Sequence, residues 1–218
     1  MGRNNSVILV LALALFCACS GPNQDEAVLG SNDEIPSIEL GISTSEHKDY
    51  WYRGTAEITS YKLHQARYGE VHEGNAVFIF VTEPFSSVYN TKADEFNTEN
   101  VSVLKLNQTR DFTTGIYPYS IMTSSFFPFK AGDHSLKVSS TSQEWCGHSY
   151  MELGKKKHDY EIDINSYFEG ESIRDIRMER GLLEDDVWSM IRIRKKLPQG
   201  KNKMYISMVS ARLLHLGV

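Results

Sequence analysis

The chain is built largely from short runs of β-branched and aromatic residues that turn residues separate. Asn75 to Thr82, with the sequence NAVFIFVT, is typical of a buried strand. Ser120 to Phe127 ends at Pro128, and Tyr160 to Ile164 alternates apolar and polar side chains. Many strands at short spacing predict a mainly β fold, either an antiparallel sandwich or a curved half-barrel.

One stretch, Gly181 to Arg192, breaks the strand pattern, because its apolar residues recur at the spacing of a helix face. Its acidic residues come early and Arg192 comes late, which suits the helix dipole. We therefore expect one late α-helix. Tyr61 to Tyr68 fits a strand or a helical turn, and we favour the strand. Turns are expected at the pairs Glu83-Pro84, Leu153-Gly154 and Glu169-Gly170.

The first residues have the features of a bacterial export signal. Arg3 precedes an apolar run from Val7 to Phe16, about half of the roughly 20 residues that a membrane-spanning helix needs. The small residue Ala18 stands directly before Cys19, so residues 1–18 are predicted to be a lipoprotein signal peptide with lipid attachment at Cys19. Attachment at Cys17 fits less well, because bulky Phe16 would lie at the cut. An ordinary secretory signal is the other alternative, and it also exports the protein.

The remaining chain divides by composition into two parts. Residues 19–48 are rich in Gly, Asn, Asp, Glu and Ser and predict a flexible tether, whereas residues 49–218 predict a single β-rich domain. Order is expected to begin near Tyr50 to Tyr52. The 23 Lys and Arg against 28 Asp and Glu give a net charge of -5, which argues against a broad basic face for nucleic acid.

Location follows from the export signal. We expect a protein of the cell envelope, held to a membrane by its N-terminal lipid and facing the periplasm or the cell surface. Ser20 directly after Cys19 favours the outer over the inner membrane by the sorting rule of some bacteria. The oligomeric state stays open.

The segment from Gln143 to His148 carries the sharpest candidate chemistry. If it is a strand, Glu144, Cys146 and His148 share one face. A thiol beside an imidazole suits a nucleophile pair or half of a metal site, and the metal stays open. The alternative, which we favour, is a structural role for Cys146 as a small buried residue.

A second candidate is an aromatic segment around a proline. Its candidate residues for an apolar surface that binds a lipid, a glycan or a partner protein are Tyr117, Tyr119, Phe126 and Phe127. The alternative, again favoured, is that these rings form the core of the β-domain.

Established catalytic and cofactor motifs are missing from the sequence: it has no GxSxG, no phosphate-binding glycine loop, no HExxH and no CxxC. We therefore assign no catalytic residue and no cofactor. The favoured function is a non-catalytic binding module for an apolar or glycan ligand or a protein partner. The alternative is an envelope enzyme or metal-binding protein that uses Cys146 and His148.

Four segments resemble a family of uncharacterised lipoproteins from Gram-negative bacteria: Trp51 to Ile58, Tyr61 to Glu70, Phe112 to Ser120 and Ser142 to His148. The resemblance covers about Trp51 to Leu214 and implies no established chemistry. Members sometimes carry the label "septum formation inhibitor Maf". True Maf proteins are cytoplasmic nucleotide pyrophosphatases, and their phosphate-binding segment is missing here. Family members look longer at the C-terminus, so a truncated C-terminus stays open.

Overall fold

A computed structural model of the chain describes residues 45–96, 98–130, 134–194, 204–205 and 207. All of them belong to one compact unit, residues 36–218. The predicted signal peptide, Cys19 and most of the predicted tether lie outside the described residues. The last four residues assigned to the tether, 45–48, belong to helix α1 (Ser45–Tyr52).

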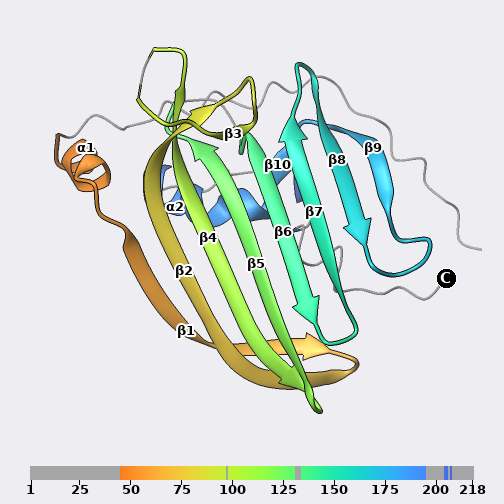
Figure 1. Cartoon of the computed structure of the whole chain (residues 1–218). Helices are drawn as coiled ribbons and strands as arrows, with labels where there is room; N and C mark the ends of the chain where they lie inside the picture. The colour runs from red at the N-terminus through yellow and green to blue at the C-terminus, as the bar shows by residue number, and fades with distance from the viewer. Residues whose placement is uncertain (1–44, 97, 131–133, 195–203, 206, 208–218) are drawn as a thin grey trace, which may run out of the picture. The chain divides into compact units, whose positions relative to one another are not determined.

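The described chain is mainly an antiparallel sheet that is open and curved (Figure 1). Its strands are β1 (Glu57–Arg67), β2 (Glu70–Ser86), β3 (Thr91–Lys92), β4 (Val101–Thr114), β5 (Tyr117–Pro128), β6 (Lys137–Glu144), β7 (Gly147–Lys155), β8 (Asp159–Ser166) and β9 (Ile173–Glu179). They pair in the order β1-β2-β4-β5-β6-β7-β8-β9, and β3 pairs with β2. Sequential neighbours thus form a meander, which corresponds to the half-barrel of the two predicted architectures.

The late helix lies across one face of this sheet (Figure 1). The strand β10 (Leu182–Leu183) and the 3₁₀ turn η1 (Glu184–Asp186) lead into α2 (Val187–Arg194). The strand β11 (Met204–Tyr205) pairs in parallel with β10. The predicted helix is confirmed but begins six residues later than Gly181, because the first residues form β10 and the acidic turn.

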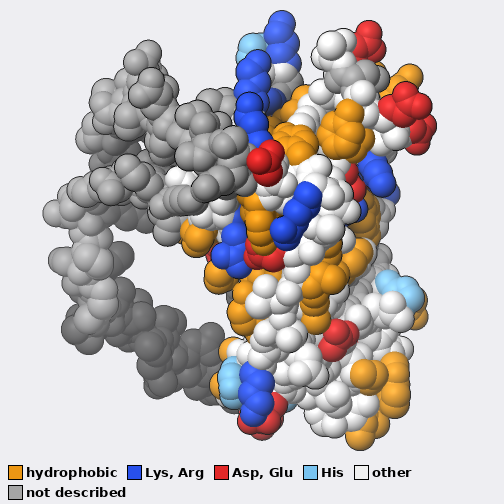
Figure 2. Space-filling model, turned by 90° about the vertical axis from the view of Figure 1, so that its left-hand side faces the viewer, with side chains coloured by type: hydrophobic (Ala, Val, Ile, Leu, Met, Phe, Trp, Pro, Cys, Tyr) orange, Lys and Arg blue, Asp and Glu red, His pale blue; other side chains and the backbone are white. Residues whose placement is uncertain are grey.

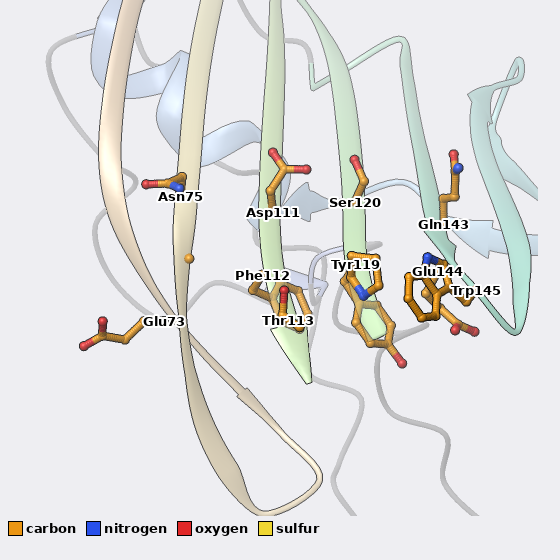
Figure 3. A pocket seen from close by; sticks show the side chains of 12 residues that line it. Glu73, Asn75, Asp111, Phe112, Thr113, Tyr119, Ser120, Gln143, Glu144 and Trp145 are labelled. Atoms are coloured by element: carbon orange, nitrogen blue, oxygen red, sulfur yellow. The ribbon is translucent and has the colours of Figure 1, made fainter. Parts of the chain in front are cut away.

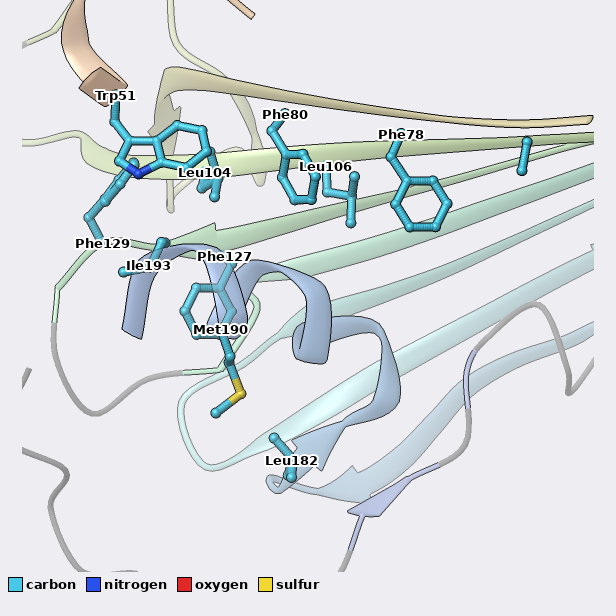
Figure 4. Close-up of a cluster of buried hydrophobic side chains, with 11 residues drawn as sticks. Trp51, Phe78, Phe80, Leu104, Leu106, Phe127, Phe129, Leu182, Met190 and Ile193 are labelled. Atoms are coloured by element: carbon cyan, nitrogen blue, oxygen red, sulfur yellow. The ribbon is translucent and has the colours of Figure 1, made fainter. Parts of the chain in front are cut away.

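The face of the sheet that contacts α2 is here called the inner face. Its core cluster (Figure 4) comprises Trp51, Ala76, Phe78, Phe80, Leu104, Leu106, Phe127 and Phe129, with Leu182, Met190 and Ile193 from the α2 side. Alternation along each strand places every second residue on this face and the residues between them on the opposite, outer face. Burial of these rings and aliphatic chains is what holds α2 on the sheet.

The predicted strands are confirmed, including the one at Tyr61 to Tyr68, of which all but the turn residue Tyr68 belong to β1. Two predicted turns are wrong. Glu83-Pro84 lies within β2, and Leu153-Gly154 lies within β7, where Gly154 pairs with Lys137. Glu83-Pro84 pairs with β4, and Leu153-Gly154 pairs with β6 and β8. This strand pairing overrides the local turn preference of these residues.

The residues from Tyr50 to Tyr52, where order is expected to begin, belong to α1. Trp51, the penultimate residue of α1, is only 5% exposed and contacts Phe80 and Phe129 through its ring. No helix that the structure describes is long and apolar enough to cross a membrane. Among the side chains that Figure 2 shows in colour, Lys and Arg lie beside Asp, Glu and hydrophobic side chains.

Candidate functional site

A turn separates the residues of the predicted site at Cys146. Trp145 and Cys146 form the tip of the hairpin between β6 and β7, so the premise of a continuous strand is wrong. His148 pairs with Gln143 and therefore lies on the outer face, where it lines one groove. Cys146 is exposed, so the favoured interpretation as a small buried residue is wrong, and it lines a different groove together with Glu144. Glu144 and Cys146 thus remain together, whereas His148 points elsewhere.

The surroundings of the Cys146 thiol do not activate it. The backbone amide of Cys146 donates to Glu144 Oε2 at 2.7 Å. Partial desolvation, followed by the hydrogen bond and negative charge of Glu144, raises the thiol pKa above its ordinary value. A raised pKa leaves less of the nucleophilic thiolate at neutral pH. Among the described residues, no group of three or more His, Cys, Asp or Glu is placed to hold a metal ion.

The aromatic candidates divide between surface and core. Tyr117 is 40% exposed and packs edge-on against Trp145, with ring centroids 6.0 Å apart. Tyr119, Phe126 and Phe127 are buried, and Phe127 is 0% exposed. The favoured interpretation of these three rings as core residues is thus confirmed, and the alternative of an apolar surface is wrong for the two phenylalanines. The helix side and a second apolar cluster cover the two faces of β5 at that level.

Sequence reasoning missed a row of polar side chains on the outer face. Strand register aligns its members across β2, β4, β5, β6 and β7: Asn75, Asp111, Ser120, Gln143 and His148. All five are exposed. Within the described part of the chain, none of these five side chains has a hydrogen-bond or ion-pair partner. Figure 3 shows the first four side by side.

An open groove of about 440 Å³ runs along this row (Figure 3). Glu73, Thr113 and Pro118 each lie two residues from a member of the row, so they share its face. Trp145 closes one end of the groove from the hairpin tip and is 69% exposed. The groove therefore combines amide, hydroxyl and carboxylate groups with an exposed indole.

A second groove of about 540 Å³ shares Tyr119 and Glu144 with the lining of the first. These two residues alternate with Ser120 and Gln143 along β5 and β6, so the second groove lies on the inner face, at the end of the sheet. Its remaining lining residues are Tyr68, Thr114, Tyr117, Cys146, Phe168 and Glu171. They come from the four turns that join β1 to β2, β4 to β5, β6 to β7 and β8 to β9, or lie next to them. In a meander, alternate turns lie at the same end of the sheet, which is why these distant segments meet.

The tyrosines of this second groove are held by a buried arginine. Arg67 Nη2 donates to the hydroxyl oxygens of Tyr68 at 3.0 Å and Tyr119 at 3.3 Å. The Tyr119 ring stacks on Phe112 with a centroid distance of 5.0 Å and an interplanar angle of 4°. Burial, and next the hydrogen bond with Tyr68, raises the pKa of Tyr119, so its hydroxyl stays protonated at neutral pH.

Only the register of several strands reveals the polar row. Ser120 lies between the buried residues Tyr119 and Ile121, and such alternation is visible in the sequence. Nothing in one strand says which residues of the next strand lie beside it. Comparison with known proteins adds no candidate function: no family model matches this chain, and no curated protein or solved structure shows significant similarity to it.

Proposed function

We propose that this chain is a lipid-anchored protein of the cell envelope that binds a carbohydrate on the outer face of its sheet. The observation that carries the proposal is the exposed polar row from Asn75 to His148 beside the exposed ring of Trp145. The envelope location rests on the predicted lipid attachment at Cys19.

Sugars present hydroxyl groups around the ring edge and apolar C–H groups on the ring face. The carboxylate of Asp111 accepts hydrogen bonds from hydroxyl groups, and the amide of Gln143 both accepts and donates them. The indole of Trp145 offers an apolar surface on which a sugar face stacks. An open groove on a sheet of fixed register places these groups in advance, which lowers the entropic cost of binding.

The inner face has little room for an apolar ligand. Phe127, Leu106 and Met190 already fill it with contacts between α2 and the sheet. Farther along the same face, Thr123 and Ser140 are buried and their hydroxyl oxygens lie 3.2 Å apart. A hydrocarbon chain would have to displace packed side chains or lie against these hydroxyl groups.

The test is a binding measurement on the full chain by titration calorimetry. The probes are three β-1,4-linked hexasaccharides, built from glucose, N-acetylglucosamine or glucosamine. We expect at least one to bind, and we expect Asp111→Ala and Trp145→Ala each to weaken that binding by about 10-fold or more, the effect of losing one hydrogen bond to a charged group or one stacking surface.

The matched control is Tyr89→Ala, which removes an exposed ring from a loop outside all the grooves described. It should leave the affinity unchanged. Absence of binding by all three probes, with the chain folded by circular dichroism, would overturn the proposal. Binding that persists unchanged in Asp111→Ala and Trp145→Ala would also overturn it.

A further inference from the structure

A third groove, of about 430 Å³, opens on the outer face of the sheet over β5 to β8. Part of the polar row lines it, namely Ser120, Gln143 and His148. Strand register aligns a second row of lining side chains next to the first: Met122, Thr141, Tyr150 and Asn165. On β5, β6 and β7 the two rows are two residues apart, so both lie on the outer face.

The third groove meets the first at Ser120 and Gln143, which line both. These two residues pair in register between β5 and β6, and both are exposed on the outer face. From this pair the first groove extends over β4 to Asn75 of β2 (Figure 3). The third groove extends the other way, over β7 to Asn165 of β8. The two grooves are therefore continuous on one face of the sheet.

A ligand in both grooves has to cross the polar row. Thr113 and Pro118 of the first groove lie between this row and the turn that joins β4 to β5, whereas Met122 of the third groove lies on the far side of the row. The path is therefore oblique to the strands. Five strand spacings separate β2 from β8, which is about 24 Å and roughly the length of five β-1,4-linked sugars.

The third groove offers the same kinds of group as the first, but no formal charge. No Lys, Arg, Asp or Glu is among the described residues that line it. Hydroxyl and amide groups and the imidazole of His148 are available for hydrogen bonds. Met122, 43% exposed, and the ring of Tyr167, 74% exposed, supply apolar surface. A sugar chain thus meets both polar and apolar partners over the whole path.

From this continuity we infer that the ligand is a linear glycan of at least about five units, the number that the path accommodates at the usual strand spacing. It lies extended in both grooves and crosses the polar row at Ser120 and Gln143. The inference rests on the proposed carbohydrate-binding function and names the class of ligand: an extended chain bound along its length, not a mono- or disaccharide. Asp111 and Trp145 hold one half of the chain, and His148 and Tyr167 hold the other.

The experiment compares two lengths of the same sugar. The hexasaccharide that binds the full chain is titrated beside the β-1,4-linked trisaccharide built from the same units, which is too short to occupy both grooves. We expect the hexasaccharide to bind about 10-fold more tightly or better, because it gains the hydrogen bonds and the stacking surface of the third groove. This gain exceeds the few-fold advantage that a longer chain has from its extra binding positions.

The double variant His148→Ala with Tyr167→Ala removes side chains of the third groove only. It should weaken hexasaccharide binding by about 10-fold and leave trisaccharide binding, which depends on Asp111 and Trp145, unchanged. His148→Ala alone should act in the same direction with a smaller effect. The matched control, His158→Ala with Tyr89→Ala, removes the same two kinds of exposed side chain outside both grooves and should change neither affinity.

The outcomes separate the inference from the function on which it rests. Equal affinities for the two lengths in the unmodified chain would overturn the inference and leave the carbohydrate site of the first groove standing. Unchanged hexasaccharide binding in the double variant, with the chain folded by circular dichroism, would do the same. Failure of all three hexasaccharides to bind would overturn the proposed function and the inference with it.

Discussion

The carboxylate of Asp186 accepts a hydrogen bond from the backbone amide of Ser135 at 3.1 Å, across 51 residues of chain. Its other oxygen, Oδ2, accepts the amide of Leu183 at 3.3 Å and lies 3.4 Å from Nδ1 of His134. Asp186 is the last residue of η1 and is fully buried. One side chain thus ties the start of α2 to the segment that leads into β6.

Replacing this carboxylate should destabilise the fold. Asp186→Asn keeps the size of the side chain but puts an NH₂ group where a backbone amide or His134 needs an acceptor. We expect the free energy of unfolding to fall by about 1–3 kcal/mol, the cost of leaving a buried donor unsatisfied. Urea unfolding measures this change. Asp94→Asn, at an exposed loop position, should change it by no more than about 0.5 kcal/mol.

Gly74 is required where β2 approaches its neighbour β4 closely. A Cβ atom at this position would lie 2.1 Å from the backbone carbonyl oxygen of Asp111, and backbone cannot move aside as a side chain can. Gly74→Ala should cost about 1–3 kcal/mol of unfolding free energy through this overlap. At Gly154 the nearest atom is the side-chain nitrogen of Asn90, at 2.8 Å. Gly154→Ala should therefore be tolerated better, and equal losses would contradict this explanation.

Substitutions of Phe127 and Tyr117, which both belong to β5, should distinguish a core position from a surface position. Phe127→Ala removes a fully buried ring beneath α2 and should lower the free energy of unfolding by about 3–5 kcal/mol. Tyr117→Ala removes a 40% exposed ring and should cost less than about 1 kcal/mol. Thermal unfolding followed by calorimetry distinguishes them. A similar loss for both would show that Tyr117 is structural and not a ligand-facing residue.

The raised pKa of Cys146 predicts slow alkylation near neutral pH. Because only the thiolate reacts, the rate with iodoacetamide should keep rising at pH values above the ordinary range for a cysteine. Glu144→Gln removes the negative charge that opposes ionisation, so the pH profile should shift to lower pH. The measurement uses a chain with Cys17→Ser and Cys19→Ser, which leaves Cys146 as the only thiol. A profile at or below the ordinary range would restore Cys146 as a candidate nucleophile.

Lipid attachment at Cys19 is a separate prediction. Cells grown with radioactive palmitate should label the unmodified chain, because acylation of Cys19 is the expected end of signal processing. Cys19→Ala should abolish the label, whereas Cys146→Ala should retain it. Equal labelling of the unmodified chain and Cys19→Ala would contradict the assignment.

Much of the fold is predictable from local pattern. The alternation in β8 and the β-branched run in β2 identify strands, because burial of one sheet face imposes a two-residue period. The strand β9 was not predicted. Of its seven residues from Ile173 to Glu179, most are polar and exposed, so its place depends on pairing with β8 and not on burial of its own side chains.

The candidate site was predictable only in part. Tyr117, Glu144 and Cys146 were named from the sequence and do lie around one groove. For Phe126 and Phe127 the sequence leaves a surface and a core interpretation open, because apolar composition does not say which side of a strand is covered. Asp111 was missed, because an exposed acid in a strand gives no local signal of the side chains that will lie beside it.

The sequence by itself determines the strand-rich composition, the late helix and, as a prediction, the export signal that ends at Cys19. These properties depend on the order of residues within a few positions. Only the tertiary structure aligns Asn75 with Asp111, Ser120 and Gln143, and only it gathers the turns that hold Tyr68, Tyr117 and Glu171. Strand register and the shared end of alternate turns decide these neighbours, and both arise from pairing between segments far apart in the chain.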